Sequence, residues 1–243
     1  MGRHGVIVNR KGKQDAKRAL MFTKYARLIT VAAKAGGDPT YNISLQNAIE
    51  KAKSINMPND NIQRAIKKGT GELAGENYEL ITYEGYGPGG VAIIVETLTD
   101  NKNRTGSSIK HYFDKYGGSL GVPGCVMYMF GRKGYFLIER TEEMIEDELL
   151  EVALDGGMED MITNDDSFEL FCDSENFYAL KDILAKASYE FVEADIELIP
   201  SINAAGLTDS DKITLQRLIN IIEEDDDVQK VYHNCSEDFE ELE

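Results

Sequence analysis

The sequence predicts an α+β fold, in which an N-terminal three-helix domain is followed by two α/β domains, one inserted into the other. Apolar residues recur at three- and four-residue steps up to about residue 75 and at every second residue after it. Residues 134–199 then follow the order β-α-β-β-α-β, which is the ferredoxin-like arrangement. The length of 243 residues agrees with this division, because a domain takes roughly 100–200 residues.

The first domain is predicted to contain three helices. The first covers about 15–34 and ends where Gly36, Gly37 and Pro39 interrupt the helical pattern. The second covers 44–56. The third begins after Pro58, with Asn59 or Asp60 as a possible N-cap, and stops at Gly69. The apolar stripe of the first helix consists of Leu20, Phe22, Tyr25, Leu28, Ile29, Ala32 and Ala33.

The second domain is predicted to be α+β and interrupted. Its strands are expected at 78–84, 91–98, 125–130 and 228–233. Its helices are expected at 104–116 and 211–222.

The inserted domain supplies the ferredoxin-like order. Its strands are expected at 135–139, 160–163, 168–172 and 191–199, and its helices at 142–154 and 177–187. The predicted domains are therefore 1–77, 78–133 plus 205–243, and 134–204.

The formal net charge of −17 is distributed very unevenly. Residues 1–75 carry a net charge of +9, the predicted insertion 134–204 carries −17, and the remainder carries −9. The total charge disfavours a polyanion as a partner. The distribution of the charge, however, leaves the N-terminal domain as the one part of the chain expected to bind a polyanion.

Several other classes of site have little support. Cys125, Cys172 and Cys235 are far apart, which favours reduced thiols over a disulfide framework or zinc site. No metal or cofactor is expected. No apolar run approaches the roughly 18 residues of a membrane helix, and the N-terminus lacks a secretory signal, so a cytoplasmic location is expected.

Gly85, Gly87 and Gly90 match the G-x-G-x-x-G pattern of dinucleotide sites. That chemistry needs a helix directly after the glycines, whose N-terminal amides face the pyrophosphate. Here a β-branched run at 91–95 follows, which favours a tight turn between two strands. No Ser/His/Asp or Cys/His grouping lies beside the polar residues 99–105 either, and we expect a protein that is not an enzyme.

Two further polar segments admit alternatives. The cluster 99–105 reads as a strand-to-helix loop with Asp100 or Asn103 as N-cap, or as a site where Asn103 and Arg104 make a specific polar contact. The acidic runs 223–227 and 237–243 are interpreted as solvated faces, because adjacent like charges repel one another.

Basic residues in the first domain give the strongest functional signal. Six of them lie within residues 3–18, where Asp15 is the only acid, and others follow on the predicted first and third helices. A solvated helix face normally mixes both signs, so this surplus favours contact with nucleic-acid phosphates. The candidate nucleic-acid-binding residues are Arg3, Arg10, Lys11, Lys13, Lys17, Arg18, Lys24, Arg64, Lys67 and Lys68.

Six segments spread over residues 1–130 resemble the YebC/PmpR family. They read QDAKR at 14–18, NMPNDNI at 56–62, RAIKKGTG at 64–71, YEGYGPGG at 83–90, LTDNKNRT at 98–105 and YGGSLG at 116–121. The length and element order fit as well, so the resemblance covers essentially the whole chain.

The resemblance implies a three-domain protein without catalytic activity. Bacterial members are described as cytoplasmic transcriptional regulators that bind DNA. Others, including a mitochondrial translational activator, are linked to the ribosome and to elongation through proline-rich stretches. Many members begin with a Gly-His-Ser-Lys-Trp-like segment, whereas this chain begins with Gly2-Arg3-His4-Gly5. A role of that Trp or Ser-Lys pair therefore does not carry over, although the basic character does.

The leading hypothesis is a non-enzymatic regulator of gene expression that binds DNA through the basic domain. The alternative is a ribosome-associated translation factor, which would use the same domain on structured RNA. A small-molecule enzyme built on the Gly85–Gly90 loop is a third, weaker hypothesis. No membrane or small-molecule partner is expected.

Overall fold

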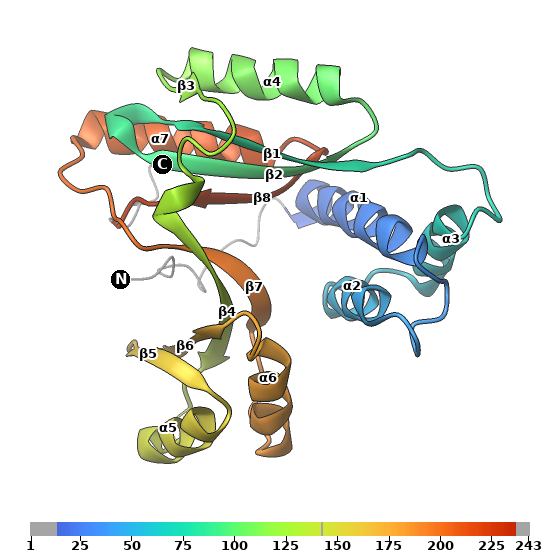
Figure 1. Cartoon of the computed structure of the whole chain (residues 1–243), viewed down its shortest axis with the longest axis vertical. Helices are drawn as coiled ribbons and strands as arrows, with labels where there is room; N and C mark the ends of the chain where they lie inside the picture. The colour runs from blue at the N-terminus through green and yellow to red at the C-terminus, as the bar shows by residue number, and fades with distance from the viewer. Residues whose placement is uncertain (1–13, 142, 237–243) are drawn as a thin grey trace. The chain divides into compact units, whose positions relative to one another are not determined.

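The computed structural model describes residues 14–141 and 143–236, with side chains from residue 18 onward, and its elements are labelled in Figure 1. The chain forms two compact units, and within the described residues one comprises 14–127 and 206–233 and the other 128–205 and 234–236. The predicted α+β class is confirmed, including the insertion of one α/β region into another. The division of the larger unit into domains 1–77 and 78–133 plus 205–243 stays a prediction, as do the boundaries of 134–204.

Three helices begin the described chain: α1 (Gln14–Ala33), α2 (Ile43–Ser54) and α3 (Asn59–Gly69). Their apolar stripes meet in one buried cluster that includes Ile29, Leu45 and Ile62. Asn42 caps α2 by accepting a hydrogen bond from the backbone N–H of Leu45 at 3.0 Å, so this helix begins one residue before the predicted Ser44. The predicted three-helix unit is confirmed.

Gly69 lets α3 approach α1 closely. A Cβ atom at this position would lie 2.3 Å from the carbonyl oxygen of Thr30 and 2.6 Å from the Cβ of Ala33. The Thr30 hydroxyl, which also belongs to the contact, donates to the carbonyls of Ala26 and Ala65. The spacing of these two helices therefore depends on a residue without a side chain.

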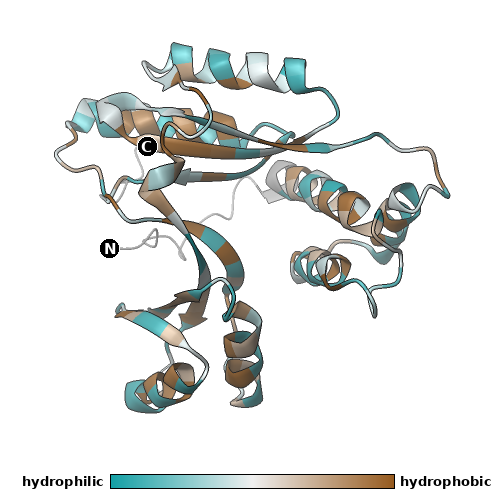
Figure 2. Cartoon of the chain, in the orientation of Figure 1, coloured by the Kyte–Doolittle hydropathy of each residue, from teal (hydrophilic) through white to brown (hydrophobic). Residues whose placement is uncertain are grey.

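The larger unit also contains a four-stranded antiparallel sheet in the order β3-β1-β2-β8. Its helices α4 and α7 contact each other and pack against β1, β3 and β8. The central strand β2 is buried along nearly its whole length, and Figure 2 shows an apolar stretch there, whereas the helices carry apolar and polar residues side by side. The elements are β1 (Glu79–Tyr86), η1 (Pro88–Gly90), β2 (Ala92–Thr99), α4 (Lys102–Lys115), β3 (Ser119–Leu120), α7 (Asp209–Glu223) and β8 (Val228–His233).

The glycine-rich segment forms a turn between β1 and β2, as predicted. It contains the short 3₁₀ element η1, in which Gly89 and Gly90 have φ values of 68° and 74°. At Gly87 a Cβ atom would lie 2.7 Å from Cδ1 of Ile93. Backbone conformation and close packing therefore explain these glycines without a nucleotide.

The predicted strand at 125–130 is wrong. Residues Met127–Met129 form a 3₁₀ turn, η2, and the strand begins only at Phe130. The reason is the buried carboxylate of Glu84, which accepts backbone N–H bonds from Gly124 at 2.6 Å, Val126 at 3.0 Å and Met127 at 2.8 Å. Those three donors are engaged by a side chain and cannot join a strand ladder.

The smaller unit has the ferredoxin-like order β4-α5-β5-β6-α6-β7 and the antiparallel strand order β5-β6-β4-β7. Its core joins the sheet to both helices and includes Phe136, Leu149, Phe168 and Leu180. Its elements are β4 (Phe130–Glu139), α5 (Glu146–Asp155), β5 (Met158–Thr163), β6 (Ser167–Asp173), α6 (Phe177–Lys186) and β7 (Glu193–Pro200).

Candidate nucleic-acid interface

The structure places only some of the predicted phosphate-binding residues. Arg3, Arg10, Lys11 and Lys13 lie outside the described residues. Lys17 lies in the first turns of α1, where the backbone alone is described.

Four of the predicted residues form what we call the basic face: Arg18 on α1 and Arg64, Lys67 and Lys68 on α3. All four side chains are exposed. Among the described residues, no acidic side chain lies within 4.0 Å of the charged groups of Arg64, Lys67 or Lys68. Their positive charges are therefore available to a ligand.

Lys24 is an exception among the predicted residues. It is only 8% exposed, and its ammonium group donates to the carbonyl oxygen of Glu223 at the end of α7, at 2.8 Å. Burial lowers the pKa of Lys24, against the opposing effect of Glu223, Asp225 and Asp226. Lys24 thus satisfies a carbonyl at a helix C-terminus. Its charged group is held inside the protein, which places Lys24 apart from the exposed residues predicted to bind phosphate.

Arg27, one turn further along α1, is held in the same way. Its Nη1 donates to the carbonyl oxygens of Leu98 at 3.2 Å and Asp226 at 2.6 Å, and to the Asp227 carboxylate at 2.6 Å. The basic residues of α1 whose side chains are described therefore separate into exposed Arg18 and the inward pair Lys24 and Arg27. This pair fastens the helix to the end of α7 and the loop before β8.

Asp227 is the centre of the polar network. Its side chain is 6% exposed and accepts hydrogen bonds from Arg27, from Arg104 at 2.8 Å and from the Thr105 hydroxyl at 2.6 Å. Burial by itself raises the pKa of Asp227, but the bonds from Thr105, Arg104 and Arg27 outweigh burial and hold the pKa below its ordinary value. The prediction of 223–227 as a solvated acidic face is therefore wrong for Asp227.

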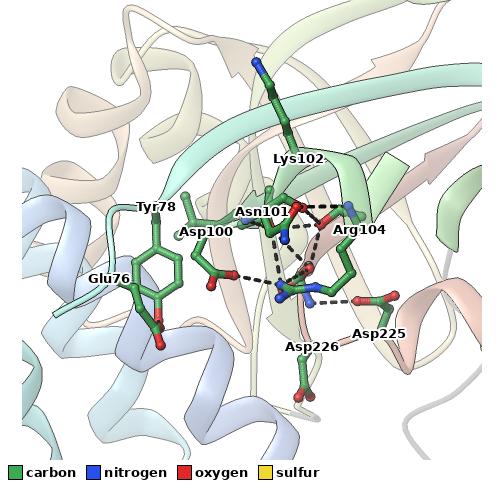
Figure 3. Close-up of polar contacts among 12 residues, drawn as sticks. Glu76, Tyr78, Asp100, Asn101, Lys102, Arg104, Asp225 and Asp226 are labelled. Carbon is green, nitrogen blue, oxygen red and sulfur yellow. Dashed lines mark hydrogen bonds and ion pairs between the residues drawn. The ribbon is translucent and has the colours of Figure 1, made fainter. Parts of the chain in front are cut away.

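Arg104 makes the specific contact that the sequence suggested as one alternative. Its Nη2 bridges Asp227 and Asp100, and its bond to Asp100 measures 2.7 Å. Figure 3 shows Arg104 turned toward Asp100, whereas Lys102 points away from the network. The N-cap of α4 is Asn101, which accepts from the Arg104 N–H at 3.1 Å, in place of the expected Asp100 or Asn103. Arg104 is therefore paired within the protein and does not belong to the basic face.

A groove runs between α1 and α3, beside the basic face. It has a volume of about 430 Å³. Phe22, Met57 and Ala65 contribute apolar surface to it, and Arg64 and Lys68 of the basic face contribute positive charge. We call it the α1–α3 groove. The sequence placed Phe22 in the apolar stripe and gave no indication that it borders a groove.

No metal centre or membrane helix is found in the described part of the chain. Its His, Cys, Asp and Glu side chains form no group of three or more that could hold a metal ion. None of the described helices is long and apolar enough to cross a bilayer.

Comparison with known proteins matches both parts of the chain to one family. Residues 3–72 match the TACO1/YebC protein N-terminal domain, and residues 78–235 match the TACO1/YebC second and third domain. The chain belongs to the TACO1/YebC family. The family resemblance carried by the six sequence segments is thereby confirmed.

Relatives of this TACO1/YebC protein are similar over their whole length. A protein of Clostridioides difficile is 56% identical over 96% of this chain and 98% of its own. A protein of Clostridium novyi is 52% identical over 96% of both chains. Each is named "probable transcriptional regulatory protein". The crystal structure of a conserved hypothetical protein from Aquifex aeolicus is 42% identical and covers 100% of both chains with a TM-score of 0.88.

Proposed function

We propose that this TACO1/YebC protein is a non-enzymatic regulator of gene expression that binds nucleic acid through its N-terminal helices. The observation that carries the proposal is the difference between two sets of basic residues. Lys24 and Arg27 are engaged inside the protein, whereas Arg64, Lys67 and Lys68 are exposed and have no acid of the described chain beside them. Phosphates attract such unpaired cations by Coulomb forces and by release of counterions.

The names of the relatives support a role in transcription, and the proposed partner is DNA in the cytoplasm. The exposed cations explain affinity but not the choice of sequence, because contacts to phosphate position a protein without reading bases. Gln63, exposed on α3, is a side chain of the type that can read an adenine edge, but a single such residue provides little discrimination.

The proposal is tested with the triple variant Arg64→Gln, Lys67→Gln and Lys68→Gln in the full chain. Binding to a 20-base-pair duplex is measured by fluorescence anisotropy between 50 and 200 mM salt. Loss of three phosphate contacts should flatten the slope of log K against log salt by roughly 3, about one for each contact.

The matched control replaces Lys102, Lys110 and Lys115 by Gln, which removes three exposed positive charges from α4 instead. If the two triple variants weaken binding equally, net charge rather than the basic face governs affinity and the proposal fails. It also fails if the α3 variant binds as the unaltered protein does.

A further inference from the structure

The α1–α3 groove combines three features that one kind of ligand would satisfy. Its apolar part includes Phe22, Met57 and Ala65, and its polar part includes Asn61, Arg64 and Lys68. Its volume of about 430 Å³ falls in the range of roughly 300–1,000 Å³ in which small organic groups are bound.

Phe22 gives the groove an aromatic ring for stacking. The ring is half-buried and borders the groove. The guanidinium carbon of exposed Arg18 lies 5.8 Å from its centroid. An aromatic ring beside an arginine accepts flat π-systems, and nucleobases stack on such pairs without regard to base identity.

The charges bordering the groove favour an anion. Arg64 and Lys68 lie one helical turn apart on α3, and both are exposed. Arg27 also borders the groove, but its charge is paired with that of Asp227. The Glu76 carboxylate accepts from the Tyr78 hydroxyl at 2.5 Å and keeps its negative charge, because a neutral hydroxyl does not offset it. Arg64 and Lys68 together exceed Glu76 by one positive charge, so the groove keeps a net attraction for an anion.

We propose that the α1–α3 groove binds an unpaired nucleotide, with its base against Phe22 and its phosphate at Arg64 and Lys68. This inference rests on the proposed function, since it specifies which form of nucleic acid the basic face holds. A base in a regular duplex is stacked on both sides, so only a bulged, looped or single-stranded nucleotide can present its face to Phe22. Unpaired DNA and unpaired RNA share this chemistry.

The test uses hairpins of equal length and charge, made in DNA and in RNA. One of each pair is fully paired, and the other carries a bulged 2-aminopurine, whose fluorescence falls when it stacks. The full-length protein should bind a bulged hairpin at least fivefold more tightly than its paired counterpart, as expected for one stacked base. The 2-aminopurine signal should decrease on binding. The pair that shows the preference identifies whether DNA or RNA supplies the nucleotide.

Phe22→Leu keeps an apolar side chain and removes the ring. This variant should lose both the preference for the bulged hairpin and the fluorescence change. Phe22→Tyr should retain both. Tyr41→Leu is the matched control, because Tyr41 is 89% exposed on the same helical bundle and does not border the groove. Thermal unfolding of each variant checks that the bundle is intact.

The outcomes separate the two proposals. Equal affinity of the unaltered protein for bulged and paired hairpins, or a preference that survives Phe22→Leu, overturns the groove inference and leaves phosphate binding intact. A preference lost in Tyr41→Leu but kept in Phe22→Leu also overturns it. Failure of every hairpin to bind contradicts the proposed function itself.

Discussion

Asp227 shows how one carboxylate joins segments that are distant in the sequence. It binds Arg27, 200 positions earlier, and Arg104 and Thr105, more than 120 positions earlier. The Asp227 side chain is 6% exposed and that of Arg27 is 14% exposed. The attraction between the two charges therefore offsets the free-energy cost of removing each of them from water.

Replacement of Asp227 by Ala should lower the free energy of unfolding by about 3 kcal/mol. Breaking a buried ion pair costs about 3–5 kcal/mol. We expect the lower end of this range, because Arg104, the second cation bound to Asp227, is 50% exposed and can be hydrated once the carboxylate is removed. Urea unfolding measures the change. Asp226→Ala is the control, because Asp226 is exposed, and a surface change of this kind should cost less than about 0.5 kcal/mol. A similar loss in both variants would contradict a special role for Asp227.

The stability difference between the unaltered protein and Asp227→Ala should depend on pH. The folded pKa of Asp227 lies below its ordinary value, so the stabilisation is complete above the unfolded pKa of about 3.9. It is lost as the pH falls through the folded value. Urea unfolding at pH 7, 5 and 3.5 should show the same gap at the first two values and a smaller gap at the third. A gap that widens on acidification would contradict this sign.

The sequence could not distinguish Asp227 from its neighbours. Asp225, Asp226 and Asp227 are identical in type and adjacent, so like-charge repulsion predicts the same solvated position for all three. Only the tertiary approach of Arg27 and Arg104 makes the third one buried. For the same reason the sequence predicts Lys24 as a phosphate ligand, although its partner in the structure is the carbonyl of Glu223. Local pattern locates charge, whereas tertiary contacts decide whether that charge is free.

At the scale of elements, the apolar period predicted the helices and strands that pack against a common core. The β-α-β-β-α-β order and strand β8 (Val228–His233) match the prediction, because apolar periods and turn signals alternate along this part of the sequence. The bounds match less well, since β4 begins at Phe130 where 135 is predicted and α5 begins at Glu146 where 142 is predicted. The prediction failed at 125–130, where Glu84 binds the backbone N–H groups of Val126 and Met127 from about 40 positions away, as well as that of Gly124 just before them. A hydrogen bond of that kind leaves no trace in local periodicity.

Gly69→Ala tests whether the contact between α1 and α3 governs stability. Alanine favours a helix over glycine by up to about 1 kcal/mol, but the added methyl group would lie 2.3 Å from the carbonyl oxygen of Thr30. Overpacking costs typically 1–3 kcal/mol, and we expect a net loss of about 1–2 kcal/mol in urea unfolding. Gly131→Ala serves as the control, since no atom lies within 4 Å of a Cβ at that position. A stabilised Gly69→Ala variant would show that the helices separate at little cost.

At the scale of the whole molecule, the charges of the N-terminal segment and of the predicted insertion act on one ligand in opposite senses. Residues 1–75 carry +9 and residues 134–204 carry −17. A polyanion attracted by the first set is repelled by the second, and salt controls how far each field extends. The screening length is about 30 Å at 0.01 M ionic strength and about 8 Å at 0.15 M. The acidic set should therefore weaken nucleic-acid binding mainly at low salt.

Glu151→Gln, Asp155→Asn and Asp182→Asn, combined in one variant, remove three exposed negative charges from α5 and α6. We expect the affinity for a duplex to rise several-fold at 0.01 M salt and by less than about twofold at 0.15 M, because salt screens charges beyond the Debye length. The control Glu151→Asp, Asp155→Glu and Asp182→Glu keeps the charge and should leave affinity unchanged. An equal gain at both salt concentrations would mean that these acids lie within a few ångströms of the bound phosphates. In that case the acidic unit would itself form part of the nucleic-acid interface.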